Sequence, residues 1–298
     1  MQIKLNILIL LDFHPVSMFQ KQDLLAKEIS RLKNEGNEIG FVATMGALHR
    51  GHLTLAERAL EENDAVVVSI FVNPTQFNNT GDLVNYPRTL EEDTQLLNTL
   101  PGNIIIYAPE PKDLYGDTVA STHYNFGGIE NQMEGKYREG HFDGVGTVLN
   151  LLFRAIAPHR AYFGEKDFQQ LQVVRKLVDI ENLPIEIVGC AIAREPNGLA
   201  MSSRNKRLTP LQFEEAAIIN ETLKIVQQHF NQWSIPKLQK YVEERFSENK
   251  HITLEYFEIA NIETLQPALR KRKGNTYRAF IAAFAGDVRL IDNMALNS

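Results

Sequence analysis

The sequence is poor in cysteine: Cys190 is the only one among 298 residues. A single thiol excludes an intrachain disulfide framework, and it also excludes a zinc site built from several thiolates. Cysteine usage of this kind is typical of a reducing compartment, so we expect the protein to be cytoplasmic. The sequence also has no run near the ~18 consecutive apolar residues that a membrane-spanning helix needs, and we expect no membrane partner.

The sequence has no excess of positive charge. Lys and Arg number 31 against 37 for Asp and Glu, which gives a formal net charge of −6. A protein without an overall basic field is not expected to bind nucleic acid, so small-molecule partners are favoured. The hydrophobic content of 44% and the charged content of 23% are typical of globular proteins, and the length suits one large domain or two unequal ones.

A short apolar run near the N-terminus, "IKLNILILLDF" (3–13), carries one lysine as a signal peptide would. No small-residue cleavage pattern follows it, so we do not expect secretion. We interpret the run as a strand or as a disordered extension.

Strand-like and helix-like patterns alternate over the first two-thirds of the chain. Segment 65–71, "AVVVSIF", is apolar without alternation, as a strand buried on both faces should be. Leu25, Ile29 and Leu32 repeat with helical spacing. Further strand-like runs are 38–43, 103–108, 160–163 and 185–189, and further helix-like runs are 52–60, 90–100, 146–156 and 168–180. This order predicts an α/β fold with a Rossmann-like, doubly wound parallel sheet, whose ligands bind beyond the carboxyl ends of the strands.

The pattern changes after the turn-rich segment 194–210, "REPNGLAMSSRNKRLTP". A long polar helical stretch runs from Pro210 to about Asn249, and two short strand-like runs follow it. We therefore expect a larger domain over 1–193, in which 1–17 form an extension, and a smaller α+β C-terminal lid domain over 194–298.

Two histidines, His49 and His52, lie in "TMGALHRGH", where a strand gives way to a helix. A helix that begins at the end of a strand presents unpaired N–H groups and a partial positive charge, which attract phosphate. Gly46 and Gly51 let the backbone approach such a ligand. A zinc pair and a purely structural role are the alternatives; the histidines straddle a glycine turn and no HExxH pattern accompanies them, which disfavours zinc.

Three further polar segments follow predicted strands: "FVNPTQF" (71–77), "FGEKDFQQ" (163–170) and "MSSRN" (201–205). Each has an ordinary interpretation when taken alone, as a turn, a capped helix start or a solvated loop. Together they supply amides for a hydroxy acid and cations and hydroxyls for a polyphosphate at one sheet edge. Because neither a Walker A nor a GxGxxG sequence is present, we expect a nucleotide site that holds phosphates by side chains and a helix end.

The chain resembles the pantothenate synthetase family from about Met18 to Asn293. The resemblance is carried by "TMGALHRGH", "FVNPTQF", "YPRT", "FGEKDFQQL", "GLAMSSRN" and the terminal "RLIDN". The resemblance implies ATP-dependent condensation of (R)-pantoate with β-alanine, giving pantothenate, AMP and diphosphate through a pantoyl-adenylate intermediate. It also implies a homodimer that uses Mg²⁺. Because Met18 lies about where family members begin, we expect an upstream start or a small extension before it.

The resemblance implies the following roles in this sequence. His52 is at the position usually assigned as proton donor, and the catalytic set is His52, His49, Lys166 and Arg204. The implied ATP contacts are Met45, Gly46, Ala47, Leu48, His49, Arg50, Gly51, His52, Gly164, Glu165, Lys166, Asp167, Ala193, Met201, Ser202, Ser203 and Arg204. The implied substrate contacts are Gln76, Gln170 and Asn73. Asp93 is an implied magnesium contact; the alternative is an acid that complements the dipole of its own helix.

The sequence departs from the usual family pattern at four positions. Ala43 and Glu139 stand where proline is usual, Arg50 replaces an acidic residue between the histidines, and Ala193 replaces a valine. Two other functions are weighed: a nucleotidyltransferase that makes a stable NDP- or NAD-like product and, in view of Ala43, Ala193 and Arg50, a nucleotide-sensing or scaffold protein that has lost the chemistry. The paired glutamines argue against the first, and the retained histidines and lysine argue against the second.

Overall fold

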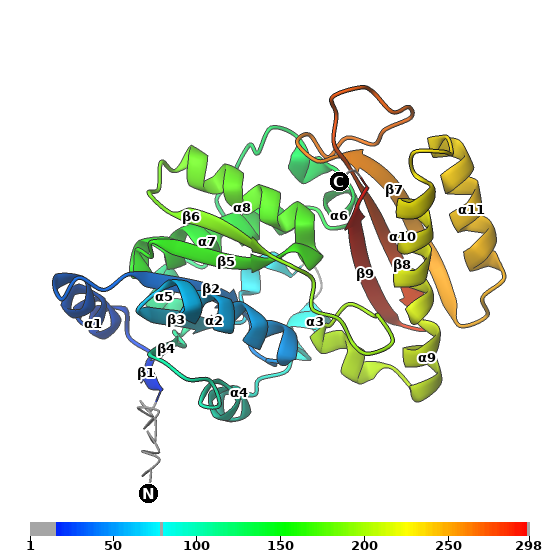
Figure 1. Cartoon of the computed structure of the whole chain (residues 1–298). Coiled ribbons are helices and arrows are strands. Elements are labelled where there is room, and N and C mark those ends of the chain that lie inside the picture. Colours follow the sequence, from blue (N-terminus) through cyan, green and yellow to red (C-terminus); the bar gives the residue numbers. More distant parts are fainter. Residues whose placement is uncertain (1–15, 78–79, 297–298) are drawn as a thin grey trace, which may run out of the picture.

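The computed structural model of the protein describes residues 16–77 and 80–296, so the apolar run at 3–13 lies outside the described residues. Its larger sheet has six parallel strands in the order β1-β4-β3-β2-β5-β6. These strands are β1 (Ser17–Phe19), β2 (Ile39–Thr44), β3 (Ala65–Ile70), β4 (Ile104–Tyr107), β5 (Arg160–Gly164) and β6 (Glu186–Cys190). The predicted Rossmann-like α/β fold is confirmed (Figure 1). The three-residue edge strand β1 was not predicted, because it is too short to show a period.

Helices cover both faces of this sheet. The main ones are α1 (Gln22–Asn34), α2 (Arg50–Glu62), α4 (Leu90–Leu97), α7 (His141–Ile156) and α8 (Phe168–Ile180). Alternate strand residues such as Phe41 and Val67 pack with α1, α7 and α8, whereas Val42 and Val68 pack with α2 and α4. Fully burying each such side chain contributes ~1.5–3 kcal/mol. Burial on both faces explains why the strands are apolar without alternation.

Short helices fill the connections and carry several of the predicted site residues. They are η1 (Pro74–Gln76), α3 (Thr80–Val84), α5 (Pro111–Tyr115), η2 (Ile129–Asn131), α6 (Glu134–Tyr137), η3 (Glu165–Asp167) and η4 (Ser203–Arg207). Within the described ranges, none of the helices combines the length and apolarity needed to cross a membrane.

The second sheet is antiparallel, with β7 (Ile252–Asn261), β8 (Tyr277–Ala285) and β9 (Val288–Ala295) in that order. It packs with helices α9 (Pro210–Glu215), α10 (Ala217–His229) and α11 (Ile235–Ser247) around a separate apolar core. The predicted long helical stretch is therefore three helices. Ser234 caps α11 and Pro236 lies in its first turn, which starts a new helix within the stretch.

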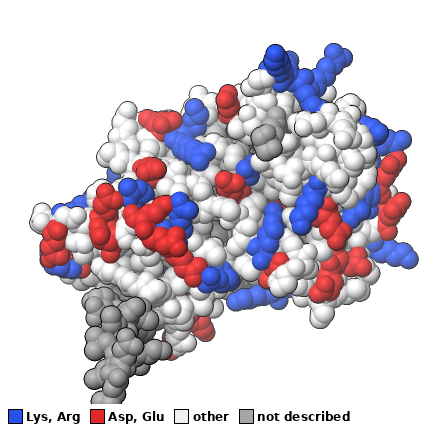
Figure 2. Space-filling view, in the orientation of Figure 1, with Lys and Arg blue, Asp and Glu red and all other residues white. Residues whose placement is uncertain are grey.

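Ion pairs join β9 of the antiparallel sheet to α6 and to the segment that follows β6. Arg194 pairs with Asp292 at 2.6 Å, and Arg289 pairs with Glu134 at 2.7 Å. The segment after β6 thus contacts β9, and the proposed division of the chain at residue 193 stays a prediction. Positive and negative side chains are interspersed over the face shown in Figure 2.

Candidate active site

A cavity of ≈ 1150 Å³ lies at the carboxyl ends of β2, β3 and β5 and extends to the antiparallel sheet. This is the edge at which the sequence predicted ligand binding. The predicted residues that line it are Met45, Ala47, His49, Gly51, His52, Asn73, Gln76, Gly164, Lys166, Asp167, Gln170, Ala193, Met201, Ser202, Ser203 and Arg204. Segments far apart in the sequence therefore meet here.

The turn after β2 is held by hydrogen bonds to its backbone. Thr44 Oγ1 donates to the carbonyl oxygen of Ser69 at 2.7 Å and accepts from the N–H of Gly46 at 3.2 Å. Gly46 has a φ of 84°, and a Cβ there would lie 3.0 Å from Asp93 Oδ2. Glycine is thus required both by the backbone conformation and by the space. The turn leads directly into the two histidines.

Asp93 is an internal support of this turn. Its Oδ2 accepts the N–H of Ala47 at 3.0 Å and its Oδ1 accepts the N–H of Leu48 at 2.7 Å, while Thr89 Oγ1 donates to Oδ2 at 3.2 Å. The residue is 2% exposed. Both carboxylate oxygens are engaged by donors, so this donor set does not fit direct ligation of Mg²⁺ by Asp93. Among the described residues, no group of three or more His, Cys, Asp or Glu side chains could hold a metal ion.

Backbone N–H groups determine which ring nitrogen of each histidine carries the proton. His49 precedes α2 and its Nδ1 accepts from the N–H of Gly51 at 3.1 Å, while His52 Nδ1 accepts from the N–H of His49 at 3.3 Å. In a neutral imidazole the other nitrogen then carries the proton. Both rings therefore have an Nε2–H group, and their centroids are 4.1 Å apart.

Both histidines are neutral near pH 7. Burial lowers the pKa of His52 to about 3, with further contributions from His49 and Lys166. Burial lowers the pKa of His49 to about 4, helped by the nearby charges of Lys166 and Lys206. They are therefore hydrogen-bond donors without a positive charge of their own, and the charge next to them is that of lysine.

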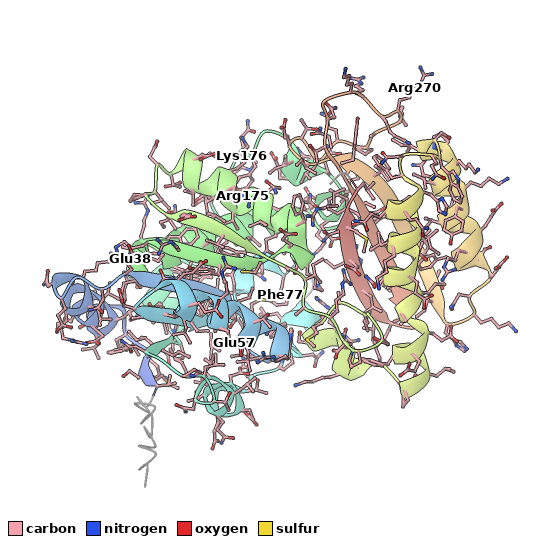
Figure 3. All side chains as sticks on the ribbon, viewed as in Figure 1. Glu38, Glu57, Phe77, Arg175, Lys176 and Arg270 are labelled. Carbon is pink, nitrogen blue, oxygen red and sulfur yellow. The ribbon has the colours of Figure 1, made fainter. Side chains whose placement is uncertain are left out.

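Arg50 lies outside the cavity. Its guanidinium forms two hydrogen bonds with the carboxylate of Glu57, at 2.7 and 2.9 Å, on the exposed face of α2. Figure 3 labels Glu57 on that helix. Residues seven apart are two helical turns apart and share a face of the helix. The ion pair therefore holds the side chain of Arg50 against the outer surface of α2. The implied ATP contact is not supported for the side chain of Arg50.

Asn73 supports the glutamine that the sequence singled out. Its Nδ2 donates to Gln76 Oε1 and to the carbonyl oxygen of Gly144, both at 3.1 Å, and its Oδ1 accepts from the hydroxyl of Tyr115 at 2.5 Å. With 1% of its surface exposed, Asn73 positions Gln76. The Nε2 of Gln76 lies 2.8 Å from the sulfur of Met45.

Neighbouring glutamines of α8 have different environments. Gln169 is 4% exposed, and its amide bonds to the N–H of Glu134 and to the carbonyl oxygens of Ile129 and Gln132. Gln170 is half-buried and lines the cavity. The structure thus places Gln170 at the cavity and uses Gln169 to hold α6.

The segment 201–207 contributes to the lining of the cavity. Ser202 caps η4 by accepting from the N–H of Arg204 at 3.3 Å, and the N–H of Met201 donates to the carbonyl oxygen of Ala193 at 2.9 Å. Ala193, which stands where valine is usual, accepts this hydrogen bond with its backbone carbonyl, so the contact does not depend on its side chain. Burial raises the pKa of Tyr86, while the charge of Arg204 lowers it. Arg204 is exposed at the edge of the cavity.

Two functional candidates, Arg138 and His141, were not predicted. Arg138 Nη1 lies 3.1 Å from His141 Nε2, and His141 Nδ1 donates to the carbonyl oxygen of Gln76 at 3.1 Å. Burial lowers the pKa of His141 to about 4, and burial also lowers the pKa of Arg138. The pair occurs in "YREGH", where Glu139 interrupts the family pattern; the turn is nevertheless closed by the N–H of His141 on the carbonyl of Arg138, at 3.1 Å.

The chain is similar to known proteins over most of its length. Residues 17–295 match the family described as pantoate-beta-alanine ligase. The pantothenate synthetase of Christiangramia forsetii is 50% identical over 283 residues, covering 95% of this chain and 100% of the relative. That of Flavobacterium psychrophilum is 50% identical over 279 residues, covering 94% and 99%.

Solved structures give the same result. The crystal structure of pantoate-beta-alanine (pantothenate synthetase) from Thermus thermophilus superposes with a TM-score of 0.87 at 38% identity, covering 95% of this chain and 100% of that one. The pantoate-beta-alanine ligase from Francisella tularensis, complexed with beta-gamma ATP and beta-alanine, superposes with a TM-score of 0.76 at 36% identity, covering 95% and 98%.

Proposed function

Because this chain belongs to the pantoate-beta-alanine ligase family, we propose that the cavity described above joins (R)-pantoate to β-alanine and cleaves ATP to AMP and diphosphate. The observation that carries the assignment to this cavity is the convergence of His49, His52, Lys166, Gln76 and Gln170 at the carboxyl ends of three strands.

The first step is adenylation of pantoate. A carboxylate oxygen of pantoate attacks the α-phosphorus, and the bond from that phosphorus to the bridging oxygen of diphosphate breaks. Charge then builds up on the departing diphosphate. The Nε2–H groups of His49 and His52 donate to these oxygens, and Lys166 supplies the positive charge. Arg204, on the exposed segment, closes over the same phosphates.

The second step is attack by the amine. The free amine of β-alanine attacks the acyl carbon, the acyl–oxygen bond breaks, AMP leaves with the electron pair, and the nitrogen releases one proton as it becomes an amide. A closed cavity keeps water from the reactive anhydride. Arg138 is a partly buried guanidinium at the cavity, linked through His141 to Gln76, so it is placed to bind the carboxylate of β-alanine.

The glutamines hold pantoate. An amide both donates and accepts, which suits hydroxyl and carboxylate groups on one small acid. Gln76 is oriented by Asn73 through its Oε1 and by Met45 through its Nε2, so its remaining N–H group is directed before the substrate arrives. Gln170 lies one helical turn after Lys166 and reaches the same cavity.

Mg²⁺, the homodimer and the cytoplasmic location stay predictions. Mg²⁺ would accompany ATP and neutralise phosphate charge, and no protein ligand is assigned to it, because Asp93 is engaged with backbone N–H groups. No step above depends on the ion.

An isotope-exchange experiment tests this function and its intermediate. The enzyme is incubated with ATP and labelled diphosphate, with and without pantoate, and the label in ATP is measured. We expect exchange that requires pantoate and does not require β-alanine, followed by release of AMP and pantothenate in equal amounts when β-alanine is added. Absence of AMP release with all three substrates would contradict the ligase function, and exchange without pantoate would contradict the acyl-adenylate.

A further inference from the structure

A carboxamide from the last strand is bound to the backbone of the turn that carries Lys166. The Nδ2 atom of Asn293, on β9, donates to the carbonyl oxygens of Glu165 and Lys166, each at 2.8 Å. Asn293 is 2% exposed. An amide has two N–H groups, so both are committed to this one turn.

The other end of the same amide is fixed by Arg278. Asn293 Oδ1 accepts from Nη1 of Arg278, and Nη2 of Arg278 donates to Glu165 Oε2 at 2.9 Å. The guanidinium lies 3.9 Å from the centre of the ring of Phe168, the first residue of α8. These contacts determine which end of the amide faces the turn, because the reversed amide would place its N–H groups against the guanidinium.

The local sequence restrains turn η3 only weakly. Gly164 precedes the turn and provides no side-chain cap, and a Cβ at Gly164 would meet nothing within 4 Å. The long-range hydrogen bonds from Asn293 therefore carry much of the restraint on the backbone. Lys166 itself is a flexible side chain whose ammonium lies 3.6 Å from Asp167 and whose surface is 17% exposed.

We propose that Asn293 is a positioning residue for adenylate formation, which holds the Lys166 turn so that the ammonium group faces the phosphates of ATP. The inference rests on the proposed role of Lys166. Electrostatic stabilisation of a leaving group is effective when the charge is already in place, and a displacement of about 1 Å can cost on the order of 100-fold in rate. Asn293 acts through Lys166 and touches no substrate.

The variant Asn293→Asp changes one group and little volume. A carboxylate keeps its contact with Arg278 but has no N–H to donate, and its second oxygen faces two carbonyl oxygens. We expect pantoate-dependent diphosphate exchange to slow on the order of 10- to 100-fold, with the KM for β-alanine unchanged. Asn293→Ser, which retains one donor, should give an exchange rate between those of the parent and Asn293→Asp. It is the second variant to measure where Asn293→Asp folds poorly.

Asn63→Asp is the matched control. The Nδ2 of Asn63 also donates twice, to the carbonyl oxygen of Ala59 and to the hydroxyl of Tyr162, and its Oδ1 also accepts from an arginine, Arg160. Asn63 lies at the far end of α2, about 20 Å along the helix from His49 at 1.5 Å per residue. Its exchange rate should stay within about twofold of the parent.

A double-mutant cycle with Lys166→Ala decides the question. If Asn293 acts through Lys166, Asn293→Asp slows exchange in the parent and changes it by less than about threefold in Lys166→Ala. An equal loss in both backgrounds, or no loss in the parent, overturns the inference while Lys166 keeps its role. Parental exchange in Lys166→Ala overturns the role of Lys166 and the inference with it.

Discussion

The Nδ1 atom of His52 accepts a hydrogen bond from the backbone N–H of His49, 3.3 Å away. One histidine thus fixes the tautomer of the other, and the donor that faces the cavity is Nε2–H. The arrangement needs a neutral ring, because a protonated His52 would turn an N–H toward another N–H. The low pKa values of both rings agree with this requirement.

We expect stability to fall as the pH is lowered from 6.5 toward 4. The pKa values of His49 and His141 are about 4 and that of His52 is about 3, against about 6.5 in an unfolded chain. The unfolded state therefore binds protons first, so the stabilisation is complete above pH 6.5 and is lost below it. Each histidine contributes up to ~1.4 kcal/mol per pH unit. Urea unfolding at pH 7.5 and at pH 5 measures the loss of free energy of unfolding, and His141→Asn should make this loss smaller. An equal loss in the variant would contradict a lowered pKa of His141 in the folded state.

His52→Ala should slow adenylate formation by ~10²-fold or more, because a donor to the departing diphosphate is lost. The rate of pantoate-dependent diphosphate exchange measures this step. His251→Ala is a control, because His251 is an exposed histidine directly before β7. Exchange at the parental rate in His52→Ala would remove His52 from the mechanism.

Arg50→Ala should leave kcat/KM for ATP within about threefold of the parent, because the guanidinium is engaged by Glu57 on the outer face of α2. The pair is exposed, so stability should change by no more than ~1 kcal/mol. Steady-state kinetics with varied ATP checks the first expectation. A tenfold increase in the KM for ATP would show that Arg50 reaches the nucleotide after all.

Asp93→Asn should destabilise the protein by ~1–3 kcal/mol and raise the KM for ATP, because an amide nitrogen would then face a buried backbone N–H of the phosphate turn. Urea unfolding and kinetics measure both effects. Glu92→Gln, at the exposed neighbouring position, is the matched control. If Asp93 instead binds magnesium, the variant will keep its stability and require more Mg²⁺.

Arg138→Ala should raise the KM for β-alanine at least tenfold and leave pantoate-dependent diphosphate exchange within about threefold, because the proposed carboxylate contact is made only by the second substrate. Arg138→Lys should restore little, since a lysine does not form the same paired hydrogen bonds. Loss of exchange and of amine binding together would assign Arg138 to the phosphates.

The sequence predicts best the features that repeat. The apolar runs of β2 to β6 and the helices between them set the parallel sheet, and the edge where ligands bind follows from that topology. Asn73 is different, because its contacts with Tyr115 and Gly144 join residues far apart in the sequence. A motif shows that such a residue lies near the site, and it does not show whether the residue meets the ligand or supports a neighbour.

Arg138 and His141 were missed for a related reason. Arg138 follows α6 and His141 is the first residue of α7, so both lie at helix ends, where no hydrophobic period marks their direction. The contact between His141 and the backbone of Gln76 spans 65 residues. The family resemblance implied a magnesium contact for Asp93, and it could not show that the carboxylate oxygens bind the backbone N–H groups of Ala47 and Leu48.

Strand β9 gives the site a dependence on the order of synthesis. Arg289, Asp292 and Asn293 bind Glu134, Arg194 and the Lys166 turn, and they are synthesised after all of the residues that they bind. The parallel sheet and both histidines are complete in the nascent chain long before these partners emerge. A growing chain can therefore present the turn of His49 and His52 early, whereas under our proposal the Lys166 turn is fixed only after β9 has docked, so that adenylation waits for a later folding event than the histidine turn does.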